Sequence, residues 1–342
     1  MNEEKIKSLK NNILAIGRLL WEKELVSGLN GNMSARVDQE TLLLTAHDTC
    51  LGLLQEEDVL ALQPDGQLLD KGEISTENLL HREIYKNFPN TQAVIHTHTS
   101  YTNAFFLENK KFIPQIFESK FYLGEVEAVE QSTPSVTEAL PVIEALRKNN
   151  IVVLRRHGVV AMGEDMFDCF LLIQALEDAV KIDAISRLYK KEGIFSAPGS
   201  LPVKKRSVKK SAAVSVQKKY ALFSQEQINE IVKVVNADRQ LHELGEKTKM
   251  NMELAVKLNE TGRTYSFRFE NGRITKVGHD EGAEFLVSAP EAVWRAVFNR
   301  EIDPFVATTQ KKMNLKGDFA KISKWYAPCS RVFELWQEVP VE

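Results

Sequence analysis

The stretch AVIHTHT, residues 93–99, indicates both the fold and the chemistry of this chain. Its apolar beginning predicts a buried strand, and side chains two apart in a strand point to the same face. His96 and His98 can therefore reach one metal ion. His157, at the end of the run IVVLRRH, is expected on a neighbouring strand, where it would add a third nitrogen ligand. Three protein ligands leave a position open for substrate, which is typical of catalytic metal sites.

Length and composition favour a two-domain soluble protein. The chain has 342 residues, of which 43% are hydrophobic and 27% charged, and it exceeds the usual size of one domain. Its net charge of −3 gives no overall attraction to nucleic acid, so we expect no such partner. No apolar run approaches the ~18 residues of a membrane span.

Cysteine usage and the N-terminal segment bear on the cellular compartment. The three cysteines are far apart and show no CxxC spacing, which predicts no disulfide framework and fits a reducing compartment. The N-terminal segment mixes charges into a helical pattern and lacks the apolar core of a signal peptide. We therefore expect a cytoplasmic protein.

A basic segment divides the chain. Residues 196–218 contain prolines, serines and many basic residues, with no acidic residue and few large apolar side chains. This composition predicts an exposed linker between a domain over 1–195 and a domain over 219–342. A basic run can also indicate nucleic-acid binding, but no aromatic residue is interleaved here.

Helical and strand patterns alternate in the first domain. The expected elements are a helix over 4–26, strands over 41–46 and 58–69, a helix over 76–87, strands over 93–99 and 151–157, and a long helix over 165–191. Ser75 or Thr76 is the expected cap of the helix over 76–87. Strands outnumber the helices that could cross between them. We therefore expect an α/β (α+β) fold of three layers, with a mostly antiparallel central sheet and helices on both faces.

The second domain reads as a smaller α+β module. A helix is expected over 225–244, followed by the hairpin TYSFRFENGRITKVGH with Asn271-Gly272 at its turn. A third strand over 285–289, a helix over 290–298 and a fourth strand over 314–319 complete one sheet with helices.

Five stretches of the first domain carry a family resemblance. They are GLNGNMSAR (28–36), TLLLT (41–45), ISTENLLHREIY (74–85), AVIHTHT (93–99) and RRHGVVAMG (155–163). In this order they make residues 5–192 resemble the class II aldolase/adducin family. That family includes fuculose- and rhamnulose-phosphate aldolases, ribulose-phosphate epimerases and methylthioribulose-phosphate dehydratases.

The resemblance implies a metal centre. His96, His98 and His157 match the three histidines that bind Zn²⁺ or another divalent ion such as Mn²⁺, Co²⁺ or Fe²⁺ in the family. Glu77 matches a glutamate that is a ligand in the resting site and a proton acceptor in the aldolases. Neutral imidazole suits Zn²⁺, the ion can stabilise an enediolate as a Lewis acid, and a carboxylate beside it can move a proton.

The resemblance also implies a substrate-binding group. Asn32 and Gly31 of the glycine-rich loop match a loop that contacts substrate phosphate, and Ser75 and Thr76 match a pair of hydroxyls with the same role. A helix beginning at these hydroxyls would add free N–H groups and a positive dipole end, which together favour an anion.

Two departures from the family pattern bear on the substrate. The aldolases have a Thr/Ser-Gly pair after the TLLLT strand, whereas this chain has Ala46-His47-Asp48, and Asp48 would repel a phosphate dianion. Whether the substrate is phosphorylated therefore stays open. Glu118 stands where the fuculose-phosphate aldolases use a tyrosine; it resembles the dehydratase-type members and could act as a second acid or base.

Residues 219–342 resemble the lipid-binding domains of the sterol-carrier-protein type. Such domains enclose an apolar tunnel, so a lipid or acyl chain is a possible ligand. The candidate lining residues are Phe285, Val293, Trp294, Val297, Phe298, Phe305 and Met313. The other interpretation is that these side chains fill a core and that the domain is a packing or assembly module.

The sequence thus predicts a divalent-metal-dependent aldolase or lyase acting on a hydroxyketone, a sugar or a sugar phosphate. One alternative is a dehydratase or epimerase that uses Glu118. Another is a non-catalytic, lipid-responsive binding or scaffold protein, as among the adducin-type relatives. The resemblance also implies a homo-oligomer, commonly a tetramer.

Overall fold

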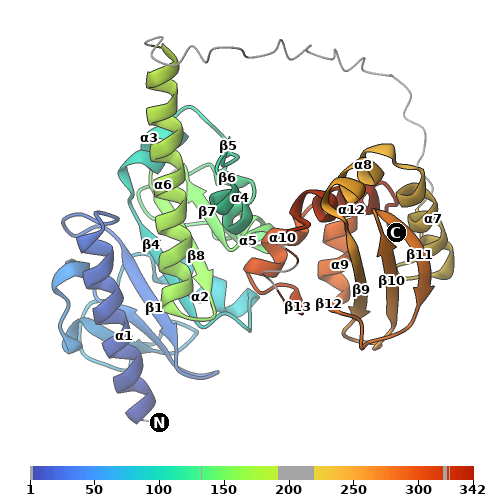
Figure 1. Cartoon of the computed structure of the whole chain (residues 1–342). Helices are drawn as coiled ribbons and strands as arrows, with labels where there is room; N and C mark the ends of the chain where they lie inside the picture. Colours follow the sequence, from blue (N-terminus) through green and yellow to red (C-terminus); the bar gives the residue numbers. More distant parts are fainter. Residues whose placement is uncertain (1–2, 132, 192–218, 319–321, 323) are drawn as a thin grey trace. The chain divides into compact units, whose positions relative to one another are not determined.

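A computed structural model describes residues 3–131, 133–191, 219–318, 322 and 324–342 of the chain (Figure 1). The chain divides into two compact units, Met1–Ser196 and Ala197–Glu342. Each unit has its own sheet and its own buried apolar clusters. The predicted linker over 196–218 lies outside the described residues. None of the helices in the described part of the chain combines the length and hydropathy that crossing a membrane requires.

An eight-stranded sheet forms the centre of the first unit, in the order β3-β2-β1-β4-β8-β7-β6-β5. The strands are β1 (Asn32–Arg36), β2 (Leu42–Thr45), β3 (Val59–Leu62), β4 (Ala93–Thr97), β5 (Lys111–Phe112), β6 (Val126–Val129), β7 (Ile151–Leu154) and β8 (Gly158–Gly163). Neighbouring strands run antiparallel except β6 and β7, which are parallel. The predicted mostly antiparallel sheet is confirmed.

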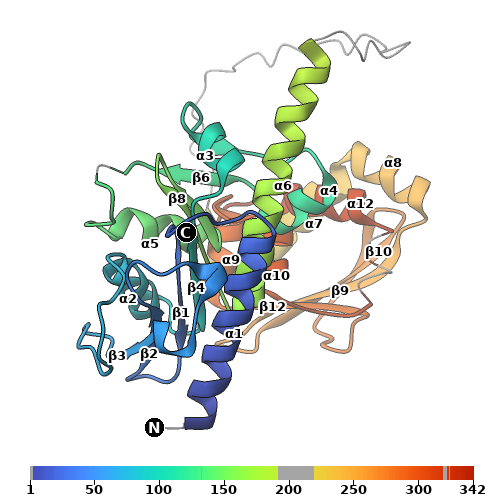
Figure 2. The same ribbon diagram turned by 90° about the vertical axis from the view of Figure 1, so that its left-hand side faces the viewer.

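Helices cover both faces of this sheet (Figures 1 and 2). On one face lie α1 (Glu3–Glu22), α3 (Ser100–Phe106), α4 (Phe117–Leu123) and α6 (Met166–Lys191). On the other lie α2 (Asn78–Asn87) and α5 (Leu140–Lys148). Two short 3₁₀ helices, Leu51–Leu53 and Glu56–Asp58, precede β3. Each face buries a separate apolar cluster, so the sheet separates two hydrophobic cores.

Strand β1 presents two different faces to these cores. Met33 and Ala35 join the core under α1 and α6. Asn32, Ser34 and Arg36 alternate with them and point to the opposite face, where α2 packs, although all three are buried. The α2 side of β1 is therefore lined by polar side chains inside the protein.

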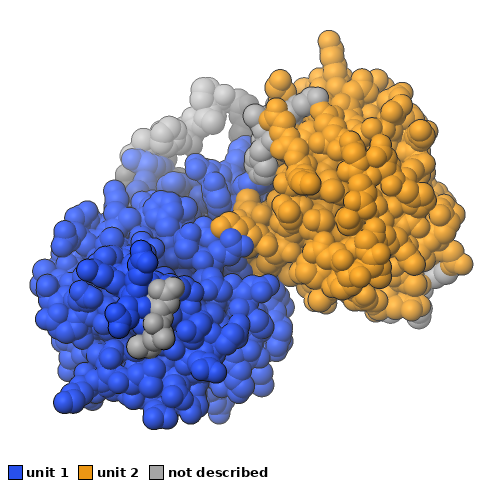
Figure 3. Space-filling view, turned by 90° about the horizontal axis from the view of Figure 1, so that it is seen from below, with its two compact units in different colours: residues 1–196 blue, residues 197–342 orange. Residues whose placement is uncertain are grey.

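The second unit (orange in Figure 3) has a five-stranded sheet in the order β11-β10-β9-β12-β13. Its strands are β9 (Asn251–Leu258), β10 (Thr264–Glu270), β11 (Arg273–Gly278), β12 (Phe285–Ala289) and β13 (Asn314–Lys316). Its helices include α7 (Gln225–Ala237), α8 (Arg239–Thr248), α9 (Glu291–Phe298), α10 (Pro304–Thr309) and α12 (Tyr326–Trp336). One apolar cluster joins the inner face of the sheet to these helices.

Several predicted elements have different boundaries in the structure. The helix expected over 4–26 ends at Glu22, and the strand expected over 58–69 ends at Leu62. The helix expected over 225–244 is two helices, α7 and α8, because the Asp238 side chain accepts a hydrogen bond from Leu241 N and so caps a new helix. The helix expected over 76–87 begins at Asn78, and its N-cap is Glu77 rather than a hydroxyl residue. Ser75 and Thr76 precede it in a turn.

Candidate active site

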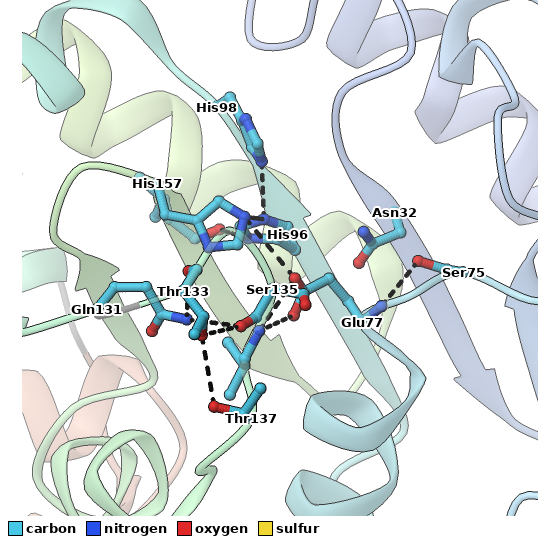
Figure 4. A network of polar contacts seen from close by, with 12 residues as sticks. Asn32, Ser75, Glu77, His96, His98, Gln131, Thr133, Ser135, Thr137 and His157 are labelled. Atoms are coloured by element: carbon cyan, nitrogen blue, oxygen red, sulfur yellow. Dashed lines mark hydrogen bonds and ion pairs between the residues drawn. The ribbon is translucent and has the colours of Figure 1, made fainter.

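Three imidazole rings meet where β4 ends (Figure 4). His96 lies on β4, and His98 follows one residue after the strand. His157 is not on a strand, as the sequence suggested, but in the turn between β7 and β8. His96 Nε2 lies 2.9 Å from His98 Nε2 and 3.3 Å from His157 Nε2. The three ring nitrogens lie within 4.8 Å of one another.

The donor set fits a divalent metal ion. His96 Nδ1 donates to the Val159 carbonyl at 3.0 Å, so the lone pair of this neutral ring is on Nε2 and points at the other two histidines. Tetrahedral zinc with Zn–N bonds of about 2.0–2.1 Å places its nitrogens about 3.3 Å apart, close to the separations of 2.9 and 3.3 Å measured from His96 Nε2. A cation between these nitrogens would remove the repulsion between their lone pairs.

Burial keeps the three histidines neutral. Burial lowers the pKa of His96 well below its usual value, and the neighbouring His98 and His157 lower it further. Burial also lowers the pKa of His98, and burial together with His98 lowers the pKa of His157 to about 4. Neutral imidazole is the form that binds a metal, so the site is ready for an ion near pH 7.

A buried carboxylate lies beside the three histidines. Glu77 is 3% exposed, and its Oε1 is 3.8 Å from His157 Nε2. The Ser75 hydroxyl accepts a hydrogen bond from Glu77 N at 3.3 Å and fixes the turn that carries the glutamate. Burial raises the pKa of Glu77, and the hydrogen bond from Val136 N partly offsets this rise. A raised pKa favours proton transfer at neutral pH.

The segment that holds Glu77 was missed in the sequence. Val136 N donates to both Glu77 carboxylate oxygens at 3.2 Å. Around it, Gln131 and Thr133 donate side-chain hydrogen bonds to the Ser135 carbonyl, and Figure 4 shows this hydroxyl-rich segment next to Glu77. The donor to Glu77 is a backbone N–H, and because every residue except proline has one, the sequence cannot identify it. Only the run of Ser and Thr residues could have pointed to a site loop.

Three of the four predicted substrate-binding residues lie next to His96 or Glu77, and the fourth is exposed. Asn32 stands opposite His96 in the β1–β4 register and is 8% exposed. Gly31, with φ +92°, brings its loop so close to β4 that a Cβ there would lie 2.9 Å from the His96 carbonyl oxygen. Ser75 is buried beside Glu77, whereas Thr76 is exposed.

Two further sequence-predicted positions lie outside the histidine cluster. Glu118 is exposed in the first turn of α4, and among the described residues no hydrogen bond or ion pair joins it to the histidines or to Glu77. His47 N donates to the Glu73 carbonyl at 2.8 Å, so the segment with His47 and Asp48 runs next to the one that leads to Ser75.

Residues 11–184 match the family model of the class II aldolase and adducin N-terminal domain. The chain belongs to this family. Residues 229–328 match the SCP-2 sterol transfer family. Both resemblances drawn from the sequence are confirmed, and the two matches lie in different compact units.

Known relatives correspond to about half of this class II aldolase family member. An L-fuculose phosphate aldolase of Methanocaldococcus jannaschii is 30% identical over 185 residues, 53% of this chain and 99% of the relative. A 3-oxo-tetronate 4-phosphate decarboxylase of Haemophilus influenzae is 27% identical over 181 residues, 51% of this chain and 85% of the relative. The crystal structure of L-fuculose-1-phosphate aldolase from Thermus thermophilus matches with a TM-score of 0.50 at 29% identity, covering 56% of this chain and 98% of that one.

Proposed function

We propose that the first unit is a divalent-metal-dependent lyase that cleaves a carbon–carbon bond of a hydroxyketone or sugar phosphate. The observation that supports this most strongly is the convergence of three neutral imidazoles beside a buried carboxylate. Relatives named as aldolases support the reaction class. A resident Zn²⁺, Mn²⁺, Co²⁺ or Fe²⁺ ion would supply Lewis-acid polarisation of substrate oxygens when bound.

The residues of the site have separate tasks in this proposal. His96, His98 and His157 hold the ion through Nε2. Glu77 moves the proton, because burial raises its pKa and the Val136 N–H fixes both carboxylate oxygens in place. Asn32, with the buried hydroxyl of Ser75, contacts polar oxygens of the substrate.

Whether the substrate carries a phosphate is a separate question. The relatives' names contain phosphate esters, which favours a phosphorylated substrate. Asp48, in the segment next to the one that leads to Ser75, would oppose an anion there. We propose a phosphorylated ketose as the first substrate to test, with the free ketose as its comparison.

A dehydratase, epimerase or decarboxylase is the second candidate. The similarity to a decarboxylase favours keeping it. The exposed position of Glu118 does not supply the second buried acid or base on which the Glu118 mechanism depends, so we rank carbon–carbon cleavage first.

The test combines metal analysis with substrate cleavage. The purified protein should contain about one divalent ion per chain and release an aldehyde from L-fuculose 1-phosphate or a related ketose phosphate. His98→Ala should lose both the ion and turnover. Glu77→Gln should keep the ion and lose turnover by about 10²-fold or more. A His98→Ala variant with full activity would refute the proposal.

We propose that the second unit binds an amphiphilic ligand, which has an apolar chain and one polar group. Trp336 is 2% exposed and makes ring contacts with Phe267, Phe298 and Phe333. Its Nε1–H is buried without a hydrogen-bond partner among the described residues, and buried polar groups are normally satisfied. A ligand's carboxyl or hydroxyl group would satisfy it.

Oleate binding tests this second proposal, and it is measured by the displacement of a fluorescent fatty acid. Trp336→Phe keeps the apolar ring and removes the N–H, so it should weaken oleate binding about fivefold or more. Wild-type protein that binds no fatty acid or sterol contradicts the proposal.

We further propose that the chain forms homo-oligomers. Large apolar side chains are exposed on α4 and α6, among them Phe117 (77%), Leu188 (60%) and Phe167 (52%). Exposed apolar groups in such number favour association between copies. Light scattering coupled to gel filtration measures the state directly, and a monomer at micromolar concentration would refute this.

A further inference from the structure

A polar seam runs between β1 and α2, formed by Asn32 and Ser34 on the strand and by His81 and Tyr85 on the helix. All four residues are at most 8% exposed. His81 and Tyr85 are four apart on α2 and therefore lie on one face of the helix. Glu77 precedes His81 by the same interval. The seam thus leads from the interior of the unit toward the histidine cluster.

Hydrogen bonds link the seam into a chain. The Tyr85 hydroxyl donates to the Ser34 carbonyl at 2.7 Å. Ser34 Oγ lies 2.6 Å from His81 Nδ1 and 2.9 Å from Tyr85 Oη. His81 Nε2 lies 2.6 Å from Asn32 Oδ1. Both ring nitrogens of His81 therefore have a hydrogen-bond partner inside the protein.

The partners fix where the proton of His81 resides. A neutral imidazole has one N–H and one lone pair, and a fully buried ring such as this one stays neutral. Because Asn32 Oδ1 can only accept, the proton belongs on Nε2. Nδ1 then accepts the proton of the Ser34 hydroxyl, and the Tyr85 hydroxyl shares its proton between Ser34 Oγ and the Ser34 carbonyl. Asn32 Oδ1 is occupied as a result, and its Nδ2 has no protein acceptor among the described residues.

We propose that His81 and Ser34 are positioning residues that turn the Asn32 carboxamide so that its N–H₂ faces the histidine cluster. There it donates a hydrogen bond to a carbonyl, hydroxyl or phosphate oxygen of the substrate. This inference rests on the proposed function, because it takes the substrate to lie beside the histidines. Asn32 stands directly across the β1–β4 ladder from His96, and Figure 4 shows both on the same side of the sheet.

The opposite arrangement makes a different, measurable prediction. If His81 carried its proton on Nδ1, Ser34 would be the acceptor and the Asn32 amide would turn around. Its oxygen would then face the substrate and could only accept a hydrogen bond. The protonated nitrogen of His81 therefore decides which group of Asn32 the site presents.

Nuclear magnetic resonance of protein with ¹⁵N-labelled histidine measures this tautomer without any substrate. The His81 signal is identified by its loss in His81→Gln. We expect the Nε2–H form in the wild type and in Tyr85→Phe, and a mixture of forms in Ser34→Ala. An Nδ1–H form in the wild type overturns the inference, whatever the protein catalyses.

Kinetics with L-fuculose 1-phosphate give the second readout. Ser34→Ala and Tyr85→Phe each remove one buried hydroxyl, so they are matched for lost stability, but only Ser34→Ala removes the donor to His81. We expect Ser34→Ala to raise KM about tenfold at nearly constant kcat, and Tyr85→Phe to change KM less than about twofold. Equal KM values in the two variants overturn the inference. If the wild type cleaves no ketose phosphate, the proposed function fails and the tautomer alone decides this inference.

Discussion

Replacing Gly158 by alanine should separate metal binding from folding. Gly158 follows His157 and opens β8. A Cβ there would lie 2.2 Å from the Thr97 carbonyl oxygen, 2.9 Å from His96 Cε1 and 2.9 Å from His98 Cδ2. Ordinary van der Waals contact begins near 3.4 Å, so the Thr97 oxygen must yield by about 1.2 Å, the difference between the two distances.

Such a displacement exceeds what a metal site tolerates. Ligand distances in metal sites hold to about 0.2 Å, and the added methyl group presses on two of the three rings at once. We expect the Zn²⁺ affinity of Gly158→Ala to fall by about 10- to 100-fold, as when supporting contacts of ligands are lost. Overpacking should also cost about 1–3 kcal/mol of unfolding free energy.

Competition with a chromogenic chelator measures the Zn²⁺ affinity, and urea denaturation of the metal-free protein measures stability. Gly28→Ala is the control, because a Cβ at Gly28 meets nothing within 4 Å, although the positive φ of this glycine (+57°) makes alanine strained there. It should lose about 1–2 kcal/mol through backbone strain and bind Zn²⁺ normally. Wild-type affinity in a folded Gly158→Ala protein would refute the reasoning.

Two further substitutions test how each unit is held together. Glu177 of α6 is 1% exposed and accepts hydrogen bonds from Tyr101 N, Thr102 N and Thr102 Oγ1. In urea denaturation, Glu177→Ala should therefore lose about 2–4 kcal/mol of unfolding free energy, and Glu177→Gln should recover part of that loss. Equal stability of the wild type and both variants would contradict this. The hydrogen bond from Arg331 lowers the pKa of Asp238, so the carboxylate stabilises the fold above its unfolded pKa of about 3.9, and this is lost as pH falls through the lower folded pKa. Asp238→Asn keeps a capping side chain, but it should be about 1–2 kcal/mol less stable than the wild type at pH 7. In urea denaturation this difference in unfolding free energy should close below pH 4. A difference that is unchanged at pH 3 would argue against the ion pair.

Local patterns in the sequence predicted the parts of the site that depend on strand alternation. His96 and His98 follow from the period of two along β4, and their rings do meet. The sequence pattern placed His157 on a neighbouring strand, but it lies in a turn, where no periodicity fixes the direction of a side chain. Its distance from His96 along the chain is bridged by the β4–β8 ladder.

Other features depend on partners that a sequence does not reveal. The Val136 N–H that holds Glu77 is a backbone group 59 residues away. The split between α7 and α8 depends on Asp238, which could have been recognised as an N-cap residue, although its ion pair with Arg331 spans 93 residues. The polar side of β1 was readable as alternation in NMSAR, but its meaning required α2 opposite it.

Strand β4 has a paired strand on either side, β1 and β8. Edge strands fray first, because half of their amide groups lack a partner in the sheet. Thermal loosening that starts at β3 or β5 therefore reaches the histidine-bearing strand only after intervening ladders have opened. Surface segments around the histidine cluster can therefore vary in sequence while the strand that carries His96 keeps its shape.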